Sequence, residues 1–217
     1  MRIFLAGASG VIGVRLIPLL VSHGHVVAGM TRSPEKVASL RRLGAEPVLC
    51  DVFDERALHD AVKDFAPDLL MHQMTDLPDD VERIPEFADG NNRIRTEGTL
   101  NLLSAKWDAG VRRFVAQSIA WTPPAGGEAV AEHERMVLDA RGVVIRYGTF
   151  YGPGTYSGNG RVPPSPRIHI DEAARRTVQL LDAPPGWSWW PRKHHEGRRA
   201  ARRPLDRAVL RLADGVR

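Results

Sequence analysis

A glycine-rich turn near the N-terminus constrains the fold of this chain more than any other sequence feature. Gly7, Gly10 and Gly13 follow an apolar run at residues 3–6, and apolar residues then recur at helical spacing over residues 11–21. A strand, a glycine-rich turn and a helix in this order are typical of a nucleotide-binding unit. Gly7 permits the tight turn, Gly10 lets a diphosphate approach the backbone, and Gly13 lets the helix lie close to the strand.

Predicted strands and helices continue to alternate along residues 1–185. This alternation indicates an α/β fold, a Rossmann-type doubly wound parallel sheet with helices on both faces. Residues 152–166 are rich in Gly and Pro and are expected to form a long loop. After the first pair, the pattern predicts strands at 25–30, 47–50, 68–72, 113–117, 143–147 and 168–170, and helices at 34–43, 55–65, 91–109, 128–140 and 171–181.

The positive net charge of +4 originates in the C-terminal tail. Nine basic and three acidic residues lie within 186–217, which leaves a charge of −2 for residues 1–185. Nucleic acid is therefore not an expected partner. No apolar stretch reaches the roughly 18 residues of a membrane span, and the glycine-rich turn interrupts the first apolar run, so we expect a cytoplasmic protein without a membrane partner. The single Cys50 excludes an internal disulfide, and no cluster has metal-ligand spacing.

Several motifs resemble one known family. The glycine spacing is G-x-x-G-x-x-G, which resembles the short-chain dehydrogenase/reductase superfamily, specifically its extended, epimerase/dehydratase-like branch. The resemblance covers about residues 1–185 and implies a substrate-binding subdomain after the last predicted helix. That continuation is lost at Gly186, so we expect this subdomain to be reduced or missing. Further matching segments are Thr31-Arg32, Asp51-Val52, 95–103, 146–154 and 168–174.

The resemblance implies a dinucleotide cofactor and indicates where it would bind. An enzyme that uses NAD usually carries an acid after the second strand, whereas Arg32 stands here and favours the 2′-phosphate of NADP(H). NAD is the less favoured alternative, and a solvated surface charge is the other interpretation of Arg32. Asp51 is expected at the adenine edge. The predicted cofactor-binding residues are Gly7, Ser9, Gly10, Val11, Ile12, Gly13, Arg32, Asp51, Val52, Gln73, Met74 and Thr75.

The catalytic residues implied by the resemblance are incomplete. In that family a Ser or Thr after the fifth strand and a Tyr-x-x-x-Lys pair on the next helix move the proton that accompanies hydride transfer. Ser118 matches the first position, with a turn-capping hydroxyl as the alternative. No Tyr of this chain has a Lys four residues later. Tyr151, in a loop similar to the family's nicotinamide-side loop, is the substitute candidate. His133 and Glu134 are interpreted as an exposed polar helix face, with a proton relay from that helix as the less favoured alternative.

These observations predict a domain at 1–185 that acts as an NAD(P)-dependent oxidoreductase or epimerase on a sugar nucleotide or a small carbonyl or alcohol substrate. The alternative is a catalytically inactive NADP(H)-binding protein, a sensor or a decayed enzyme. A homodimer is compatible with either. The basic tail at 186–217 is expected to be poorly ordered or partly helical. With 26 Arg and 4 Lys in the chain, we interpret it as frameshifted or degenerate sequence, or alternatively as a basic helix at about 204–213.

Overall fold

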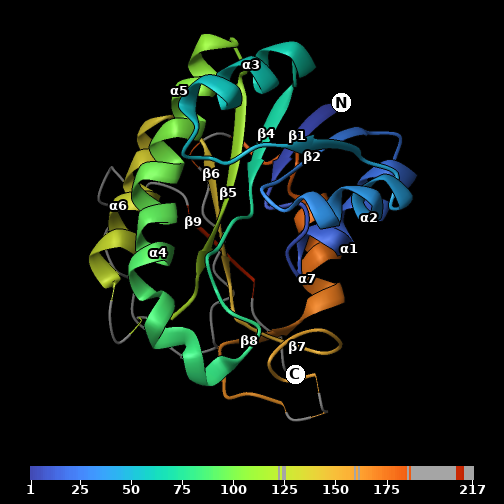
Figure 1. Cartoon of the computed structure of the whole chain (residues 1–217). Coiled ribbons are helices and arrows are strands. Elements are labelled where there is room, and N and C mark those ends of the chain that lie inside the picture. Colours follow the sequence, from blue (N-terminus) through green and yellow to red (C-terminus); the bar gives the residue numbers. More distant parts are fainter. Residues whose placement is uncertain are drawn as a thin grey trace.

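A computed structural model describes residues 1–121, 123, 126–158, 160, 162–184, 186 and 209–212. Its centre is a parallel sheet in the order β3-β2-β1-β4-β5-β6-β9 (Figure 1). A second, small sheet pairs β7 with β8. The strands are β1 (Arg2–Ala6), β2 (Val26–Thr31), β3 (Glu46–Leu49), β4 (Leu69–His72), β5 (Arg113–Ile119), β6 (Val143–Tyr147), β7 (Thr149–Tyr151), β8 (Arg167–His169) and β9 (Val209–Leu212).

The strand order reverses next to β1. The chain runs outward from β1 to β2 and β3, then crosses back so that β4 pairs with the other side of β1. In open α/β sheets, ligands bind at this switch point, beyond the carboxyl ends of the strands. The topology confirms the Rossmann-type fold expected from the sequence.

Helices cover both faces of the sheet. In Figure 1, α1, α2 and α7 lie together on one side, and α4, α5 and α6 lie on the other. The helices are α1 (Gly13–Ser22), α2 (Val37–Arg42), α3 (Glu55–Phe65), α4 (Ala88–Arg93), α5 (Thr99–Asp108), α6 (Gly127–Asp139) and α7 (Ile170–Gln179), with 3₁₀ turns at Pro34–Lys36 and Val81–Phe87. Within the described residues, none of these helices is long and apolar enough to cross a membrane.

Strand β1 shows why the sheet needs both layers. Its side chains alternate between the two faces. Ile3 and Leu5 pack with Leu16 of α1 in one buried cluster, whereas Phe4 packs with Leu58 of α3 in the other. All four of these β1 and α1 side chains are fully buried, as is Leu58. A strand without a polar face is stable only between two covering layers.

The helix predicted at 91–109 is interrupted. Helix α4 begins earlier, at Ala88, and a π-helical segment, Ile94–Gly98, separates it from α5. Single π-helical turns inside α-helices occur frequently at functional sites.

Two segments differ from the sequence expectations. Strand β7 at Thr149–Tyr151 was not predicted, and its pairing with β8 closes the base of the expected loop at 152–166. Strand β9 pairs in parallel with β6, with Val144 opposite Val209, so a helix over 204–213 is wrong for 209–212. The backbone of this segment extends the sheet at the edge formed by β6. The other expectations for the tail fall at 187–208 and 213–217, outside the described residues.

Candidate functional site

The glycine-rich turn has two crowded glycines and one open glycine. Gly7 has a φ of +88°, and a Cβ there would lie 2.6 Å from the carbonyl carbon of Gln73. A Cβ at Gly13 would lie 2.4 Å from the carbonyl oxygen of Gly7. At Gly10 the nearest heavy atom would be 3.4 Å away, an ordinary contact. The fold therefore requires glycine at the first and third positions, and the second leaves free space beside the backbone.

The N-terminus of α1 follows this turn directly. Its N-cap residue, Ile12, makes no side-chain hydrogen bond, and the first turn of α1 contains no acidic residue. The partial positive charge of the helix N-terminus is thus not offset by a side chain of that turn. Ser9 is fixed by a 2.9 Å hydrogen bond between its hydroxyl and that of Thr31 at the end of β2. Such a turn suits an anionic ligand such as a diphosphate.

The predicted cofactor-binding residues all lie at the carboxyl ends of neighbouring strands. The glycine-rich turn follows β1, Arg32 follows β2, Asp51 and Val52 follow β3, and residues 73–75 follow β4. Asp51 accepts a 3.0 Å hydrogen bond from the backbone N–H of Phe53, as a turn-forming carboxylate does. Val52 is buried, and its carbonyl accepts from the Asn101 side chain. The fold therefore brings the predicted set to one edge of the sheet.

Arg32 is engaged in an ion pair that the sequence did not indicate. Its Nη2 atom lies 2.7 Å from Oδ1 of Asp76, which follows β4. The Arg32 side chain is 57% exposed and that of Asp76 21% exposed. The guanidinium is thus accessible to a ligand but already carries a carboxylate partner.

Residues 73–75 are held by backbone contacts around β4. The N–H of Gln73 donates to the Ala6 carbonyl of β1 over 2.8 Å. The carbonyl of Met74 accepts a 2.7 Å hydrogen bond from the side chain of Gln117 on β5. Gln73 is buried, whereas Thr75 is exposed. This segment therefore connects the carboxyl end of β1 to that of β5.

Ser118 lies within β5, not after it, and its hydroxyl is committed to a buried carboxylate. Its Oγ donates to Oε1 of Glu134 on α6 over 2.5 Å. Arg146, which lies opposite Ser118 in the register of β5 and β6, donates through Nε to the same oxygen over 2.7 Å. A second Arg146 nitrogen contacts Oε2 of Glu134. The three side chains form one polar cluster between the sheet and α6.

His133 and Glu134 are not on an exposed polar helix face, so that interpretation is wrong. Only 1% of His133 and 7% of Glu134 are exposed. One ring nitrogen of His133 bonds the Thr99 hydroxyl over 2.7 Å, and the other contacts the Gln117 carbonyl over 2.8 Å. Burial lowers the pKa of His133 to about 4. Specific polar partners on β5, β6 and α5 explain why this face of α6 is polar and yet buried.

Tyr151 ends β7, and its surroundings differ from those of Ser118. The register of the small sheet places Tyr151 opposite His169 of β8. The two rings meet edge to face, with centroids 5.2 Å apart. The two predicted catalytic residues thus contact different elements: Ser118 contacts Glu134 on α6, and Tyr151 contacts His169 on β8.

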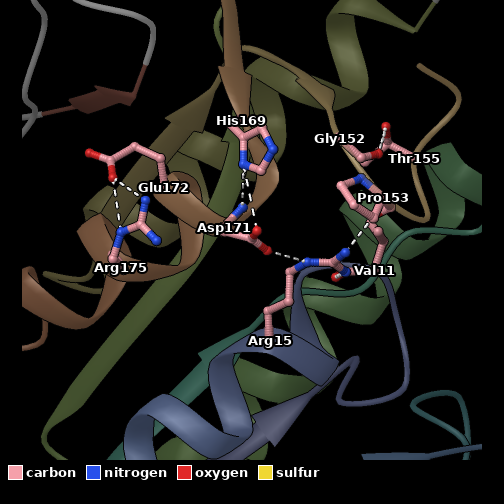
Figure 2. Close-up of polar contacts among 9 residues, drawn as sticks. All are labelled: Val11, Arg15, Gly152, Pro153, Thr155, His169, Asp171, Glu172 and Arg175. Atoms are coloured by element: carbon pink, nitrogen blue, oxygen red, sulfur yellow. Dashed lines mark hydrogen bonds and ion pairs between the residues drawn. The ribbon is translucent and has the colours of Figure 1, made fainter. Parts of the chain in front are cut away.

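Arg15 joins the glycine-rich turn to the loop that follows β7 (Figure 2). Its guanidinium donates to the Val11 carbonyl over 2.8 Å and to the Pro153 carbonyl over 2.5 Å. Its Nε also pairs with Asp171 at the start of α7 over 2.8 Å. The loop continues across to the segment after β4, where the Tyr156 hydroxyl donates to the Pro78 carbonyl. No sequence motif indicated this clamp, because its partners are mostly backbone carbonyls.

The sheet order and the glycine-rich turn together define a Rossmann-type nucleotide-binding fold. The family model of the NAD dependent epimerase/dehydratase family matches residues 3–137. The chain belongs to this family, which confirms the resemblance seen in its sequence motifs.

Two proteins of similar sequence have descriptive names. The chain is 38% identical over 225 residues to a protein named 3-diazoavenalumate denitrifying reductase from a Streptomyces species, a match that covers 84% of this chain and 73% of the relative. It is 33% identical over 90 residues to a decarboxylating sterol-4-alpha-carboxylate 3-dehydrogenase of Dictyostelium discoideum, covering 42% of this chain and 27% of that protein.

Among solved structures, the fold is similar to UDP-glucose 4-epimerase of Thermus thermophilus in complex with NAD. The TM-score is 0.70 at 19% identity, and the match covers 85% of this chain and 76% of the epimerase. At this identity, the likeness concerns the fold.

Proposed function

We propose that this chain binds a nicotinamide dinucleotide along the carboxyl edge of the sheet, with the diphosphate at the glycine-rich turn. The observation that carries this proposal is the uncrowded Gly10, where a Cβ would meet only the Gly7 carbonyl oxygen at 3.4 Å, between two glycines that packing requires. The uncapped N-terminus of α1 adds a favourable field for an anion. Asp51 and Val52 would contact the adenine side, and Gln73, Met74 and Thr75 the ribose and nicotinamide side.

Both NAD and NADP are candidates. The family description and the NAD complex of the Thermus epimerase support NAD. Arg32 supports NADP, because a guanidinium can hold a 2′-phosphate through two hydrogen bonds. We therefore propose that the protein binds both forms, and parallel fluorescence titrations with NADH and NADPH measure each affinity directly.

The proton-donating groups at the site favour one class of hydride acceptor. A bound reduced nicotinamide supplies a hydride. Hydride addition to a carbonyl creates an alkoxide, which needs a proton from an acid such as the family's Tyr. This chain has no Tyr-x-x-x-Lys pair, and the Ser118 hydroxyl already donates to Glu134. Tyr151, the substitute candidate, packs against His169 of β8, whereas Ser118 contacts α6. An acceptor that becomes neutral on receiving a hydride needs no such acid.

An aryl diazonium ion meets this requirement. Addition of hydride to its terminal nitrogen forms an N–H bond and a neutral aryl diazene. The carbon–nitrogen bond then breaks, dinitrogen leaves, and the proton that was on nitrogen ends on the ring carbon. The Streptomyces relative, whose name describes a reductase acting on a diazo compound, supports this choice. We propose an aryl diazo compound as the substrate class.

The test is cofactor oxidation with matched acceptors. The purified protein is given NADPH or NADH with one of three hydride acceptors: a benzenediazonium salt that carries a para-carboxylate, a ketone or an aldehyde. We expect nicotinamide oxidation and dinitrogen release with the diazonium salt, above the rate without protein and above that of the Gly10→Ala variant. Turnover of the ketone or aldehyde alone would overturn the proposed substrate class.

A second candidate function is cofactor binding without turnover. The commitment of the Ser118 hydroxyl and the missing Tyr-x-x-x-Lys pair favour it. In that case the titrations with NADH and NADPH show saturable binding, whereas none of the three acceptors is reduced. The same experiment therefore separates a reductase from a sensor or a decayed enzyme.

A further inference from the structure

Arg32 and Asp76 approach each other from opposite sides of β1. Strands β2 and β4 flank β1 in the sheet. Arg32 follows β2, Asp76 lies four residues beyond β4, and their side chains meet at 2.7 Å. The ion pair therefore spans the carboxyl end of β1, where the glycine-rich turn begins. A dinucleotide bound at this turn would lie close to both charges.

The two partners differ in their freedom to move. The N–H of Asp76 donates to Oδ1 of Asn91 on α4 over 3.2 Å. Oδ2 of Asp76 lies close to Gly90, and a Cβ added at Gly90 would be only 2.2 Å from this oxygen. The backbone of Asp76 is therefore fixed to α4 and its side chain is only 21% exposed, whereas the Arg32 side chain is more than half exposed. In this pair the guanidinium is the end that can turn toward a ligand.

The carboxylate of Asp76 opposes a 2′-phosphate in two ways. It occupies one donor nitrogen of Arg32, so a phosphate must compete for that nitrogen. It also carries a negative charge close to the position where the guanidinium would hold a phosphate dianion. The 2′-hydroxyl of NAD(H) carries no charge, so it meets neither penalty.

We propose that Asp76 is a specificity-determining residue that holds Arg32 and so reduces the preference of this site for 2′-phosphorylated cofactors. The inference rests on the proposed binding of a nicotinamide dinucleotide. It explains how a chain with Arg after β2 can belong to a family described as NAD dependent. Arg32 alone predicts NADP(H), whereas Arg32 paired with Asp76 serves both cofactors.

The experiment measures affinities for two pairs of probes. NADPH and NADH are titrated by nicotinamide fluorescence, and adenosine 2′,5′-bisphosphate and 5′-AMP by calorimetry, so that the second pair isolates the 2′-phosphate. The variants are Asp76→Asn, Arg32→Gln and the double variant. Asn keeps the shape of Asp76 against Gly90, and thermal unfolding checks that each variant is folded. Asp79→Asn is the matched control, since it removes an exposed carboxylate three residues away.

We expect Asp76→Asn to increase the affinity for NADPH and for adenosine 2′,5′-bisphosphate by about three- to tenfold. This is the range for losing an exposed ion pair and a nearby like charge. NADH and 5′-AMP should bind unchanged. Relative to Arg32→Gln, the double variant should gain less, because the competition for the Arg32 nitrogen is then absent and only the repulsion by the Asp76 charge is removed. An equal change for both cofactors, or the same gain in Asp79→Asn, would overturn the inference while leaving the proposed function intact. If the wild-type protein binds none of the four probes, the proposed function and the inference both fail.

Discussion

The hydroxyl of Ser118 and the Nε of Arg146 converge on one carboxylate oxygen of Glu134, over 2.5 Å and 2.7 Å. Only 9% of the Glu134 side chain and 23% of the Arg146 side chain are exposed. This cluster ties α6 to β5 and β6 at the carboxyl edge of the sheet. It gives Ser118 a structural role that does not depend on catalysis.

Replacing Glu134 should destabilise the fold. Glu134→Ala leaves the largely buried Arg146 without its carboxylate, and breaking such a pair costs about 3 kcal/mol. Urea unfolding measures the loss. The matched control is Glu132→Ala, the same change at an exposed position of α6, which should stay within about 0.5 kcal/mol of wild type. Equal effects of the two variants would contradict the role of the cluster.

The glycine-rich turn offers a test that separates binding from folding. Gly10→Ala should keep the fold, since its Cβ has space. It should lower the affinity for NADPH and NADH by about tenfold, equivalent to one charge-assisted hydrogen bond of roughly 1.5 kcal/mol. Gly127→Ala, also in open space with an ordinary φ, should change neither affinity. Fluorescence titration and thermal unfolding give both readouts, and unchanged cofactor affinity in Gly10→Ala would argue against a diphosphate at this turn.

His133 makes stability depend on pH. Burial lowers its pKa in the folded protein from 6.5 to about 4, so between these values the unfolded chain binds the extra proton. The contribution to stability is complete above pH 6.5 and falls as the pH is lowered toward 4, by about 2 kcal/mol between pH 7 and pH 5. Burial also lowers the pKa of His72, whose ring lies 5.2 Å from that of His133, so His72 adds in the same direction.

Unfolding free energies at pH 7 and pH 5 check this prediction. His133→Asn should be less stable than wild type at pH 7, but it should lose less stability on acidification. His23→Asn, at an exposed position after α1, should retain the wild-type pH dependence. The same loss on acidification in wild type and His133→Asn would refute the assignment.

The clamp at Arg15 should limit opening of the loop after β7. In this loop the N–H of Thr155 donates to the Gly152 carbonyl, and the N–H of Gly158 donates to the Thr155 carbonyl. Arg15→Met removes the contacts to Val11, Pro153 and Asp171, so these two amides should exchange with deuterium several-fold faster. Hydrogen-exchange mass spectrometry of residues 152–158 measures this.

Arg175→Met provides the comparison for Arg15, since it removes another guanidinium that pairs with Glu172 on α7. Exchange in the loop should remain as in wild type. If both variants accelerate exchange equally, the effect is a general loss of stability, and Arg15 does not specifically restrain the loop at Pro153.

Local patterns were sufficient for most of the regular elements. The periodicity of apolar residues located α3 at Glu55–Phe65 and β6 at Val143–Tyr147 with the bounds that the structure shows. The spacing of Gly7, Gly10 and Gly13 indicated the strand, turn and helix that the fold contains. The π-helical segment at Ile94–Gly98 was not predicted, because the apolar spacing over 91–109 indicated one continuous helix.

The sequence by itself determined the order of strands and helices and the class of fold, since both follow from contacts between residues near in the chain. Only the tertiary structure decided which polar residues share a partner. Arg32 meets Asp76 across 44 positions, and Arg15 meets Asp171 across 156. The first pair forms because the parallel sheet brings the carboxyl ends of β2 and β4 to one edge, and the second because α1 packs beside α7 on one face of the sheet. No local spacing of residues records either proximity.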